Sequence, residues 1–285
     1  MNVLSLFDGM SCGRIALERA GINVTSYHAS ELDKYAIQVT QANWPDTVQL
    51  GDVTQWREWD IDWKGIDLLI GGSPCQGFSF AGKKLAFDDP RSALFFVYVD
   101  ILNHIRSVNP RVKFMLENVR MKKEYLAIIS EQLGVEPVFI NSALVSAQNR
   151  QRYYWANWKI KQIEDKGILS SDIIDQENQT PNNKGWQKWW LINGEFQLKK
   201  KYSCILCEVE KAITQTARQV SSWNGNLVIT KQGLRFISPM EAERLQTVPD
   251  NYTNHVSNTQ RYKMLGNGWT VDVIAHIFTQ GLKNA

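Results

Sequence analysis

The sequence predicts an α/β fold: a doubly wound, mainly parallel sheet with a small inserted domain. Short apolar runs alternate with amphipathic stretches through residues 1–157, which is the pattern of repeated βαβ units. Glycine or proline ends several of these stretches, as at Gly21 and Pro110. A chain of 285 residues that is 44% hydrophobic is long enough to bury one large core beside a smaller one.

Each predicted element follows from its own pattern of apolar residues. Strands are predicted at 2–9, 24–31, 47–53, 66–72, 113–119, 135–145 and 152–158. Helices are predicted at 14–21, 34–43, 93–108, 125–134, 238–248 and 270–282. Ser238 and Glu241, three residues apart, form a capping box that predicts where the fifth of these helices begins.

The regular alternation stops after Trp158. A polar stretch, QENQTPNNKG, follows, and helical periodicity returns only at 238–248. We therefore predict a main domain of residues 1–157 plus 233–285. Residues 158–232 would form the inserted domain.

The segment 158–232 is basic and rich in tryptophan. It carries eleven basic and eight acidic side chains, which accounts for the whole net charge of +3. Its tryptophans are Trp158, Trp186, Trp189, Trp190 and Trp223. Basic and aromatic side chains together are typical of a nucleic-acid surface. A small core with lysine-rich loops explains the same composition equally well.

Composition disfavours several classes of protein. No apolar run approaches the roughly 20 residues of a membrane span, and the N-terminus lacks the basic and apolar regions of a signal peptide. Four cysteines without such a signal indicate a reducing compartment, so a cytoplasmic protein is expected. Cys204 and Cys207 form a lone C-x-x-C without a second ligand pair, and we expect no metal site.

Polar or reactive side chains occur where successive predicted strands end: Asp8, Glu31, Asp52, Cys75 and Glu117. Ligands of open α/β sheets bind outside the carboxyl ends of the strands. A carboxylate such as Glu31 can accept from both hydroxyls of a ribose there, and Asp52 could accept from an adenine amino group. These positions indicate a nucleoside-binding crevice without a phosphate cradle.

Cys75 follows a proline at the end of the fourth strand, beside this crevice. A thiolate is a strong nucleophile, but a buried cysteine often serves as a small apolar side chain. Glu117 ends the next strand, where a poorly solvated carboxyl group can keep and donate a proton. Arg150 and Arg152 would share one face of a strand, aimed at a carbonyl oxygen and a phosphate or engaged in surface ion pairs. These partners favour a nucleophilic Cys75.

The motifs, in this order, resemble those of the cytosine-5 DNA methyltransferases. SLFDGMSCG resembles the first cofactor motif, Glu31 the second and GDV the third. GGSPCQGFS resembles the catalytic Pro-Cys motif, ENV the glutamate motif and QNRQR the Q-x-R-x-R motif. RFISPMEAERLQTVPDNY and GNGWTVDVIAHI resemble the last two motifs. The resemblance covers residues 2–157 and 233–282, and implies the S-adenosylmethionine-dependent methyltransferase fold with an inserted target-recognition domain.

The resemblance implies S-adenosylmethionine as the cofactor, S-adenosylhomocysteine as the product, and no metal. The residues of the matching motifs would line the cofactor site: Phe7, Asp8, Gly9, Met10, Ser11, Cys12, Gly13, Glu31, Leu32, Asp52, Val53, Pro74, Leu94, Asn267 and Trp269. The family's usual F-A-G-x-G-G is FDGMSCG here, and this version, with Trp269, is similar to the animal de novo DNA methyltransferases. The PCQ and GN versions are closer to bacterial enzymes, so a compact prokaryotic or phage enzyme is expected.

The resemblance also implies how the methyl group is transferred. Cys75 would add to carbon 6 of a cytosine, which makes carbon 5 nucleophilic. Glu117 would hold ring nitrogen 3 and the exocyclic amine, and Arg152 the carbonyl oxygen 2. Arg150 would contact a phosphate or support the loop. The reaction is that of a DNA (cytosine-5-)-methyltransferase.

Double-stranded DNA is the implied partner, with the target cytosine flipped out of the helix. A loop over 76–92 would close on the base, and residues 211–226 would read the sequence in the major groove. The candidate DNA contacts are Gln76, Ser79, Phe80, Ala81, Lys83, Thr214, Thr216 and Arg218. Arg218 is the candidate for a guanine contact, although a surface arginine without a base partner fits almost as well.

Two alternatives remain open: a transfer RNA cytosine-5 methyltransferase of the same fold, and an inactive DNA-binding homologue. The first typically carries a Cys-Phe-Thr tripeptide, which this sequence lacks. The second would be indicated by loss of Cys75 or Glu117, and both are present. The protein is expected to act as a monomer away from membranes, in a restriction-modification system or as an orphan or phage enzyme.

Overall fold

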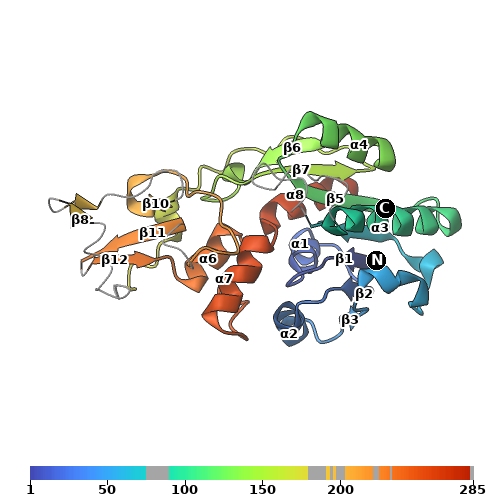
Figure 1. Ribbon diagram of the computed structural model, residues 1–285, viewed down its shortest axis with the longest axis horizontal. Coiled ribbons are helices and arrows are strands. Elements are labelled where there is room, and N and C mark those ends of the chain that lie inside the picture. Colours follow the sequence, from blue (N-terminus) through green and yellow to red (C-terminus); the bar gives the residue numbers. More distant parts are fainter. Residues whose placement is uncertain are drawn as a thin grey trace. The chain divides into compact units, whose positions relative to one another are not determined.

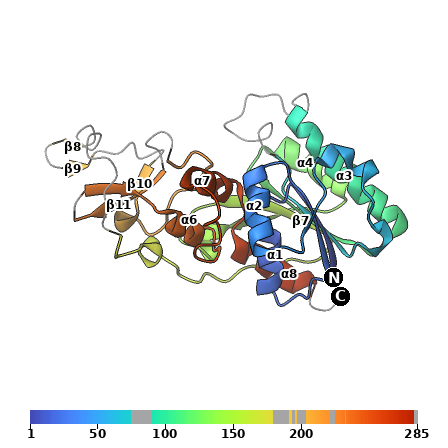
Figure 2. The ribbon, with the colours of Figure 1, turned by 90° about the horizontal axis from the view of Figure 1, so that it is seen from below.

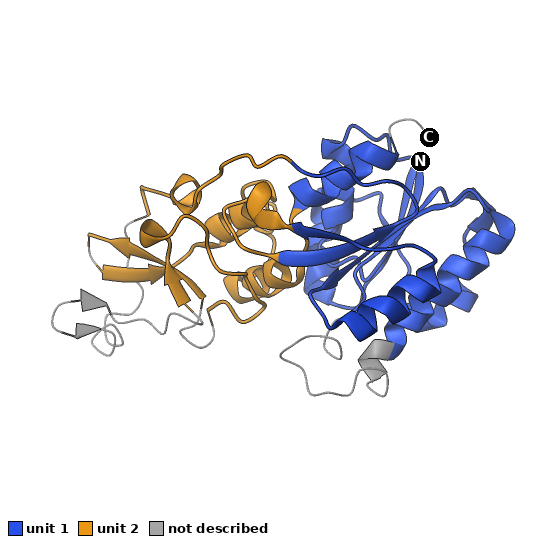
Figure 3. Ribbon diagram, turned by 90° about the horizontal axis from the view of Figure 1, so that it is seen from above, with its two compact units in different colours: residues 1–140, 151–163, 271–285 blue, residues 141–150, 164–270 orange. Residues whose placement is uncertain are grey.

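The computed structural model describes residues 1–74, 90–178, 191–192, 195–196, 203–220, 225–231 and 233–282. The chain forms two compact units, which Figure 3 colours separately. The first unit consists of Met1–Ile140, Gln151–Ile163 and Val271–Ala285. The second unit consists of Asn141–Arg150 and Glu164–Thr270.

A seven-stranded sheet, in the order β3-β2-β1-β4-β5-β7-β6, forms the centre of the first unit. Each pairing from β3 to β5 is parallel, whereas β5 and β7 are antiparallel. The strands are β1 (Asn2–Leu6), β2 (Ser26–Ser30), β3 (Val48–Gln49), β4 (Leu68–Gly71), β5 (Lys113–Val119), β6 (Val138–Asn141) and β7 (Gln151–Ala156). The predicted fold class is confirmed, and each of the seven predicted strands is present.

Helices cover both faces of this sheet (Figures 1 and 2). On one face lie α3 (Pro90–Val108) and α4 (Lys123–Leu133), and on the other lie α1 (Cys12–Arg19), α2 (Lys34–Asn43) and α8 (Val271–Gly281). The core between the sheet and α3 is built from fully buried side chains such as Leu69, Phe95 and Phe114. Across the ranges that the structure describes, no helix is both long and apolar enough to span a bilayer.

Local sequence explains where these helices begin and end. Asp33 caps α2, because its side chain accepts a hydrogen bond from the backbone of Tyr35. The chain leaves α1 and α4 through Gly21 and Gly134, whose φ values of +71° and +72° suit glycine. Helix α3 begins at Pro90, three residues before its predicted start, because proline is favoured in the first turn.

Among its described residues, the second unit contains smaller sheets and two α-helices. One sheet has the order β10-β11-β12, and β8 pairs with β9 in another. The elements are β8 (Leu191–Ile192), β9 (Glu195–Phe196), β10 (Ser203–Ile205), β11 (Gly225–Thr230), β12 (Gly233–Phe236), α6 (Pro239–Leu245) and α7 (Asn258–Asn267). Short 3-10 helices connect elements of both units: η1 (Val53–Glu58), η2 (Trp63–Gly65), η3 (Ser142–Leu144), η4 (Ser170–Ile173) and η5 (Leu206–Glu208).

Residues 233–270 lie in the second unit, although the sequence groups them with the main domain. A buried ion pair explains the difference. Arg235 of β12 donates from both terminal nitrogens to Glu241 of α6, at 2.7 and 2.8 Å. Glu241 also accepts from the backbone of Asp175 at 2.8 Å, so three parts of the chain share one carboxylate. The assignment of 158–232 to DNA recognition stays a prediction.

The sequence analysis does not predict α7 or the strands of the second unit. Helix α7, NTQRYKMLGN, has no clear apolar stripe, because its buried face includes Arg261. The charge of Arg261 is balanced by the buried Glu243, whose Oε1 lies 2.9 Å from Nη2. The capping box of α6 is confirmed, since the backbone of Glu241 donates to Ser238 Oγ at 3.1 Å and the backbone of Ser238 donates to Glu241 at 2.6 Å.

Glu241 should contribute more to stability than the helix cap of which it is part. Glu241→Ala leaves the Arg235 guanidinium buried without its carboxylate, and we expect the free energy of unfolding to fall by about 3–5 kcal/mol. Ser238→Ala removes only the cap and should cost about 1 kcal/mol. Urea denaturation followed by circular dichroism measures both losses, and equal values would contradict the role of the ion pair.

Candidate active site

The turn after β4 is held by a side chain of β5. Asn118, which is 1% exposed, donates from its amide to Ser73 Oγ at 3.1 Å and to the Ser73 carbonyl at 3.4 Å. Pro74 follows, and Cys75 is the next residue of the chain. Cys75 itself lies outside the described residues. The structure therefore fixes the two residues before the predicted nucleophile at the carboxyl end of β4.

Glu117 and Arg152 form an ion pair beside this turn. Arg152 of β7 pairs with Val119 of β5, two residues beyond Glu117, so both side chains lie on the same face of the sheet. Nε of Arg152 lies 2.9 Å from Oε1 of Glu117, and the two side chains are only 14% and 11% exposed. The pair is thus mostly removed from solvent. It is not one of the surface ion pairs that were the alternative prediction for Arg150 and Arg152.

Arg150 does not share the surroundings of Arg152, and the prediction that both face the same way from one strand is wrong. Strand β7 begins at Gln151, so Arg150 precedes it. Arg150 is 3% exposed, and its guanidinium donates to the backbone carbonyls of Gln215 at 2.9 Å, Gly266 at 3.1 Å and Gly268 at 2.9 Å. Of the two roles predicted for Arg150, these bonds match support of a loop rather than contact with a phosphate.

The loop after β1 has an unusual backbone. Phe7, Gly9 and Ser11 have φ values of +57°, +60° and +60°. This left-handed conformation costs a residue with a side chain roughly 1–2 kcal/mol, so the loop needs compensating bonds. Asp8 supplies them, because its carboxylate accepts from the Ser5 hydroxyl at 2.5 Å and also from Ser11 Oγ.

The Asp8 carboxylate is turned into the protein. Besides the two serines, the hydroxyl of Tyr27 on β2 donates to it at 2.7 Å. Burial raises the pKa of Asp8 from 3.8 to about 6, although hydrogen bonds from Ser11, Ser5 and Tyr27 oppose the shift. Its side chain therefore stabilises the loop in this structure. That Asp8 also contacts a cofactor stays a prediction.

Glu31 follows β2 and closes the same loop. Its Oε2 accepts from the backbone of Gly9 at 2.7 Å, and its Oε1 accepts from the backbones of Leu32 and Asp33, both at 2.8 Å. A carboxylate has about four acceptor positions, so it can still take a ligand hydroxyl. The neighbouring Leu32 is 69% exposed, which leaves an apolar surface beside the carboxylate. These groups fit a ribose with an adenine next to it.

Asp52 has a structural role in the turn after β3. Its Oδ1 accepts from the backbone and the hydroxyl of Thr54, both at 2.9 Å, and so caps η1. Within the described part of the chain, no partner is recorded for Oδ2. Asp52 can therefore cap the short helix and still accept from a ligand amino group.

The other predicted cofactor residues are divided between the units. Met10, Cys12, Gly13 and Val53 are buried, whereas Pro74 and Leu94 are partly exposed in the same unit. Asn267 is exposed at the end of α7, and Trp269 is partly buried two residues later. Both belong to the second unit. Their participation in the cofactor site stays a prediction.

The predicted DNA-contacting residues are only partly described. Gln76, Ser79, Phe80, Ala81 and Lys83 lie outside the described residues, as do Trp186, Trp189, Trp190 and Trp223. Thr216 and Arg218 are exposed, and the Thr214 hydroxyl donates to the Asn149 carbonyl. The Lys211 ammonium donates to the carbonyls of Ala143, Ser146 and Ile168, so its donors are used within the protein. One of the eleven basic side chains of 158–232 is therefore not available for a direct contact with a DNA phosphate.

Sequence reasoning missed the residues that hold the site together. Asn118 stands inside the ENV motif, and its position next to Glu117 on the opposite face of β5 was the available signal. Tyr27 gave a weaker signal, because a tyrosine in a buried strand needs a partner for its hydroxyl. Gln148, the first residue of the QNRQR motif, received no role from the sequence, and in the second unit it donates to the Leu245 carbonyl at 2.5 Å.

Cysteine and metal chemistry outside this site find no support in the part of the chain that the structure covers. No group of histidine, cysteine, aspartate or glutamate side chains there is arranged to hold a metal ion. The thiol of Cys204 lies 3.0 Å from Oδ1 of Asn226, and burial raises its pKa. Cys204 therefore behaves as a small, partly buried side chain rather than a reactive thiol.

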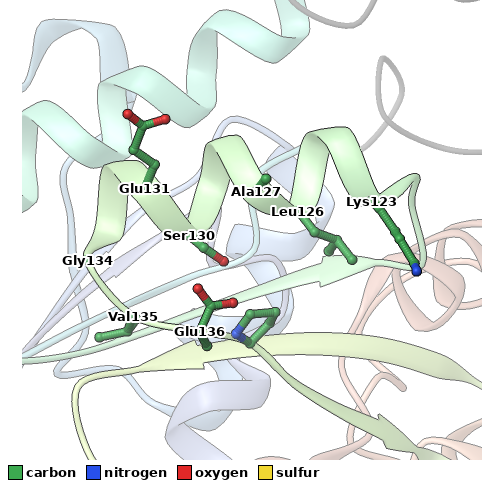
Figure 4. Close-up of a pocket in the computed structure, with 9 residues that line it drawn as sticks. Lys123, Leu126, Ala127, Ser130, Glu131, Gly134, Val135 and Glu136 are labelled. Atoms are coloured by element: carbon green, nitrogen blue, oxygen red, sulfur yellow. The ribbon is translucent and has the colours of Figure 1, made fainter.

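A pocket of 630 Å³ lies on the first unit, along α4 (Figure 4). Its lining consists of Lys123, Leu126, Ala127, Ser130, Glu131, Gly134, Val135, Glu136 and Pro137. None of the predicted catalytic, cofactor or DNA-contacting residues is among them. The hydroxyl of Ser130 accepts from Nε1 of the buried Trp155 at 3.1 Å, so this wall is part of the core. The pocket is distinct from the candidate active site.

Comparison with known proteins gives consistent matches. The family model of the C-5 cytosine-specific DNA methylases matches residues 1–226 and 138–283. The chain is 32% identical to Type II methyltransferase M.NlaX of Neisseria lactamica, in an alignment that covers 98% of this chain and 95% of that protein. It is also 32% identical to Type II methyltransferase M1.ScrFI of Lactococcus lactis subsp. cremoris, over 95% and 75% of the two chains. The solved structure of the Entamoeba histolytica methyltransferase EhMeth has the same fold, with a TM-score of 0.75 at 18% identity over 98% and 96% of the two chains.

Asp8 should make stability depend on pH in the mildly acidic range. Because its pKa is raised from 3.8 to about 6, the protonated carboxyl favours the folded state. The contribution is complete below about pH 4 and is lost as the pH rises through 6, a loss of about 3 kcal/mol. Asp8→Asn removes this dependence. Urea denaturation of both proteins from pH 4 to 7.5 tests it, and a difference between them that does not change with pH would contradict the assignment.

Proposed function

This chain belongs to the C-5 cytosine-specific DNA methylase family, and we propose that it methylates carbon 5 of a cytosine flipped out of double-stranded DNA, through a covalent adduct with Cys75. The coarser activity, cytosine-5 methyl transfer, follows from membership of the family. The substrate, the flipping and the adduct are the proposal. Its main support is that consecutive residues of β5 bind two parts of the proposed site: Glu117 pairs with Arg152, and Asn118 holds Ser73, two residues before Cys75.

Each group at this point has a chemical task in the proposed reaction. The Cys75 thiolate adds to carbon 6 of the base, and the displaced electron pair makes carbon 5 nucleophilic. Glu117 binds ring nitrogen 3 and the exocyclic amine, where charge develops, and Arg152 donates to the carbonyl oxygen 2. After methyl transfer, a proton acceptor removes the proton from carbon 5 of the cytosine, and the Cys75 thiolate leaves from carbon 6.

The pairing of Glu117 with Arg152 supports this assignment of roles. The two side chains lie on one face of the sheet and orient each other at 2.9 Å before any base is bound. Asn118 faces away from them and holds Ser73. Consecutive residues of β5 thus position two parts of the proposed site. Glu117 orients the arginine that would bind the cytosine, and Asn118 holds the turn that leads to Cys75. This reduces the free-energy cost of aligning them.

The loop after β1 and the carboxylates that follow it fit S-adenosylmethionine. When bound, this cofactor supplies the methyl group. Glu31 would accept hydrogen bonds from the ribose hydroxyls, and Asp52 would accept one from the adenine amino group. The exposed Leu32 would contact the adenine ring. Phe7 and Pro74 would border the site from the ends of β1 and β4. We also propose that Asn267 and Trp269 of the second unit contact the cofactor.

We further propose that residues 211–226 read the DNA sequence and that the segment 76–92 closes over the flipped base. Two curated relatives are type II methyltransferases, which supports a role in a restriction-modification system. The runner-up substrate is transfer RNA. A test must therefore present both nucleic acids to the same enzyme preparation.

Bisulfite sequencing of plasmid DNA from bacteria that express the protein tests the proposal most directly. We expect 5-methylcytosine in one sequence context, and none in plasmid from cells that express Cys75→Ser, because serine is a far weaker nucleophile toward carbon 6. The Cys75→Ser protein should still bind S-adenosylmethionine in calorimetry, which controls for folding. Methylation by the serine variant at the wild-type rate would rule out the adduct.

The same preparations distinguish the substrates. Purified wild type should transfer tritiated methyl groups to duplex DNA and not to transfer RNA, and the reverse result would establish the runner-up. A duplex that contains 5-fluorocytosine at the methylated position should trap the wild type covalently, because fluorine cannot be removed as a proton is. An active enzyme that forms no such adduct would contradict attack by Cys75.

Glu31 should be needed for cofactor binding rather than for folding alone. Glu31→Ala removes the proposed ribose acceptor and three backbone contacts, so we expect the dissociation constant for S-adenosylmethionine to rise at least about 10-fold, which is roughly 1.4 kcal/mol. Asp33→Ala is the matched control, since it removes the cap of α2 two residues away and leaves the Glu31 carboxylate in place. Calorimetric titration measures both variants. Equal effects, or an unchanged affinity in Glu31→Ala, would contradict the assignment.

A further inference from the structure

The segment 147–150, just before β7, pairs with 212–215 in the second unit. The backbone of Ala212 donates to the Ala147 carbonyl at 2.7 Å, and the backbone of Asn149 donates to the Ala212 carbonyl at 2.9 Å. The Gln148 side chain accepts from the backbone of Gln215 at 3.1 Å. The first part of the proposed recognition segment is therefore fixed to the residues that carry Arg150.

Arg150 extends this attachment to the end of α7. One terminal nitrogen of its guanidinium donates to the Gln215 carbonyl at 2.9 Å. The other donates to the carbonyls of Gly266 at 3.1 Å and Gly268 at 2.9 Å. Gly266 and Gly268 flank Asn267, a proposed cofactor residue. A single planar, rigid group thus spans the proposed recognition segment and the proposed cofactor-binding turn.

Direct packing joins the same two segments. A Cβ atom added to Gly266 would lie 2.1 Å from the carbonyl carbon of Thr216 and 2.2 Å from the backbone nitrogen of Ala217. The two stretches of backbone are therefore in close contact, with no side chain between them. Because close-packed backbones leave no free volume, a shift of 215–217 must move 266–268 as well.

We propose that Arg150 and Gly266 couple DNA binding to cofactor binding, with Arg150 as a positioning residue. The proposal rests on the proposed function, because it takes 214–218 as a DNA-contacting segment and Asn267 and Trp269 as cofactor residues. DNA bound at Thr216 and Arg218 restrains or shifts the backbone of 215–217, and the guanidinium transmits that change to 266–268. By linkage, bound cofactor favours DNA binding by the same factor.

The alternative is that Arg150 is purely structural. Its guanidinium donates to three carbonyls, and its loss would remove that donor from Gln215 and Gly266, while Gln246 still donates to the Gly268 carbonyl at 3.3 Å. A structural residue lowers stability and the fraction of folded protein, but it does not change the ratio of cofactor affinities measured with and without DNA. That ratio therefore separates the two roles.

The experiment measures the dissociation constant for S-adenosylhomocysteine by calorimetry, alone and with saturating duplex. The duplex carries the sequence context that bisulfite sequencing identifies, and wild type must first be shown to methylate it. We expect wild type to bind at least about 5-fold tighter with DNA present, the lower end of typical coupling. In Arg150→Met the ratio should fall below about 2.

Three further variants keep the test decisive. Gly266→Ala leaves Arg150 in place but forces apart the backbones at 216–217 and 266, so its ratio should also fall below about 2. Arg150→Lys keeps the charge but has a single nitrogen in place of the planar fork, so its ratio should also fall below about 2, and it serves if neither Arg150→Met nor Gly266→Ala folds. Lys211→Met is the matched control, since Lys211 likewise holds three backbone carbonyls in the second unit but does not reach 266–268. Its ratio should equal that of wild type.

A wild-type ratio near 1, or a ratio in Arg150→Met and Gly266→Ala equal to that of wild type, would overturn the coupling. So would an equal fall in Lys211→Met, because the effect would then follow any disturbance of the unit. Failure of the proposed function has a different signature, since wild type would then methylate no duplex at all.

Discussion

Strand β5 holds both sides of the candidate active site through two consecutive side chains. Because neighbouring residues of a strand face opposite ways, Glu117 reaches Arg152 on β7 while Asn118 reaches Ser73 after β4. The antiparallel pairing of β5 with β7 brings Arg152 within reach of Glu117. The parallel pairing of β5 with β4 brings the turn at Ser73 within reach of Asn118. A one-residue slip in either register would separate these groups, so the proposed chemistry depends on the order of the sheet.

The loop after β1 shows how a ligand site can be held in a costly conformation. Two residues with side chains, Phe7 and Ser11, adopt left-handed backbone angles there. Two hydrogen bonds made by the loop offset this cost. The Ser11 hydroxyl donates to Asp8, and the backbone of Gly9 donates to Glu31, which follows β2. Both carboxylates act on the same short loop: Asp8 accepts from three hydroxyl groups, and Glu31 accepts from three backbone N–H groups. A cofactor bound at this loop, as proposed, would meet a backbone that is already shaped, which lowers the entropy lost on binding.

Much of this fold could be predicted, because the strands and helices of the first unit have clear apolar periods and the carboxyl ends of parallel strands gather reactive residues. Asp8, Glu31, Asp52 and Glu117 were all identified in that way. The direction of a side chain could not be predicted, as Asp8 shows, because it depends on partners such as Tyr27 on another strand. Helix α7 was missed for a related reason, since Arg261 is buried only because Glu243 neutralises it. The position of Cys75 stays a prediction.

The two arginines of the Q-x-R-x-R motif show why spacing alone does not define a role. A separation of two residues puts side chains on one face only if both lie in a strand, and β7 begins between them, at Gln151. Arg152 therefore stays in the sheet with Glu117, whereas Arg150 satisfies carbonyls of the second unit. Under the proposed mechanism, loss of either guanidinium could lower methyl transfer, Arg152 by contact with the base and Arg150 by its hold on the backbone of 215 and 266–268. An activity assay would therefore not distinguish the two roles, and a measurement of binding is needed to assign them.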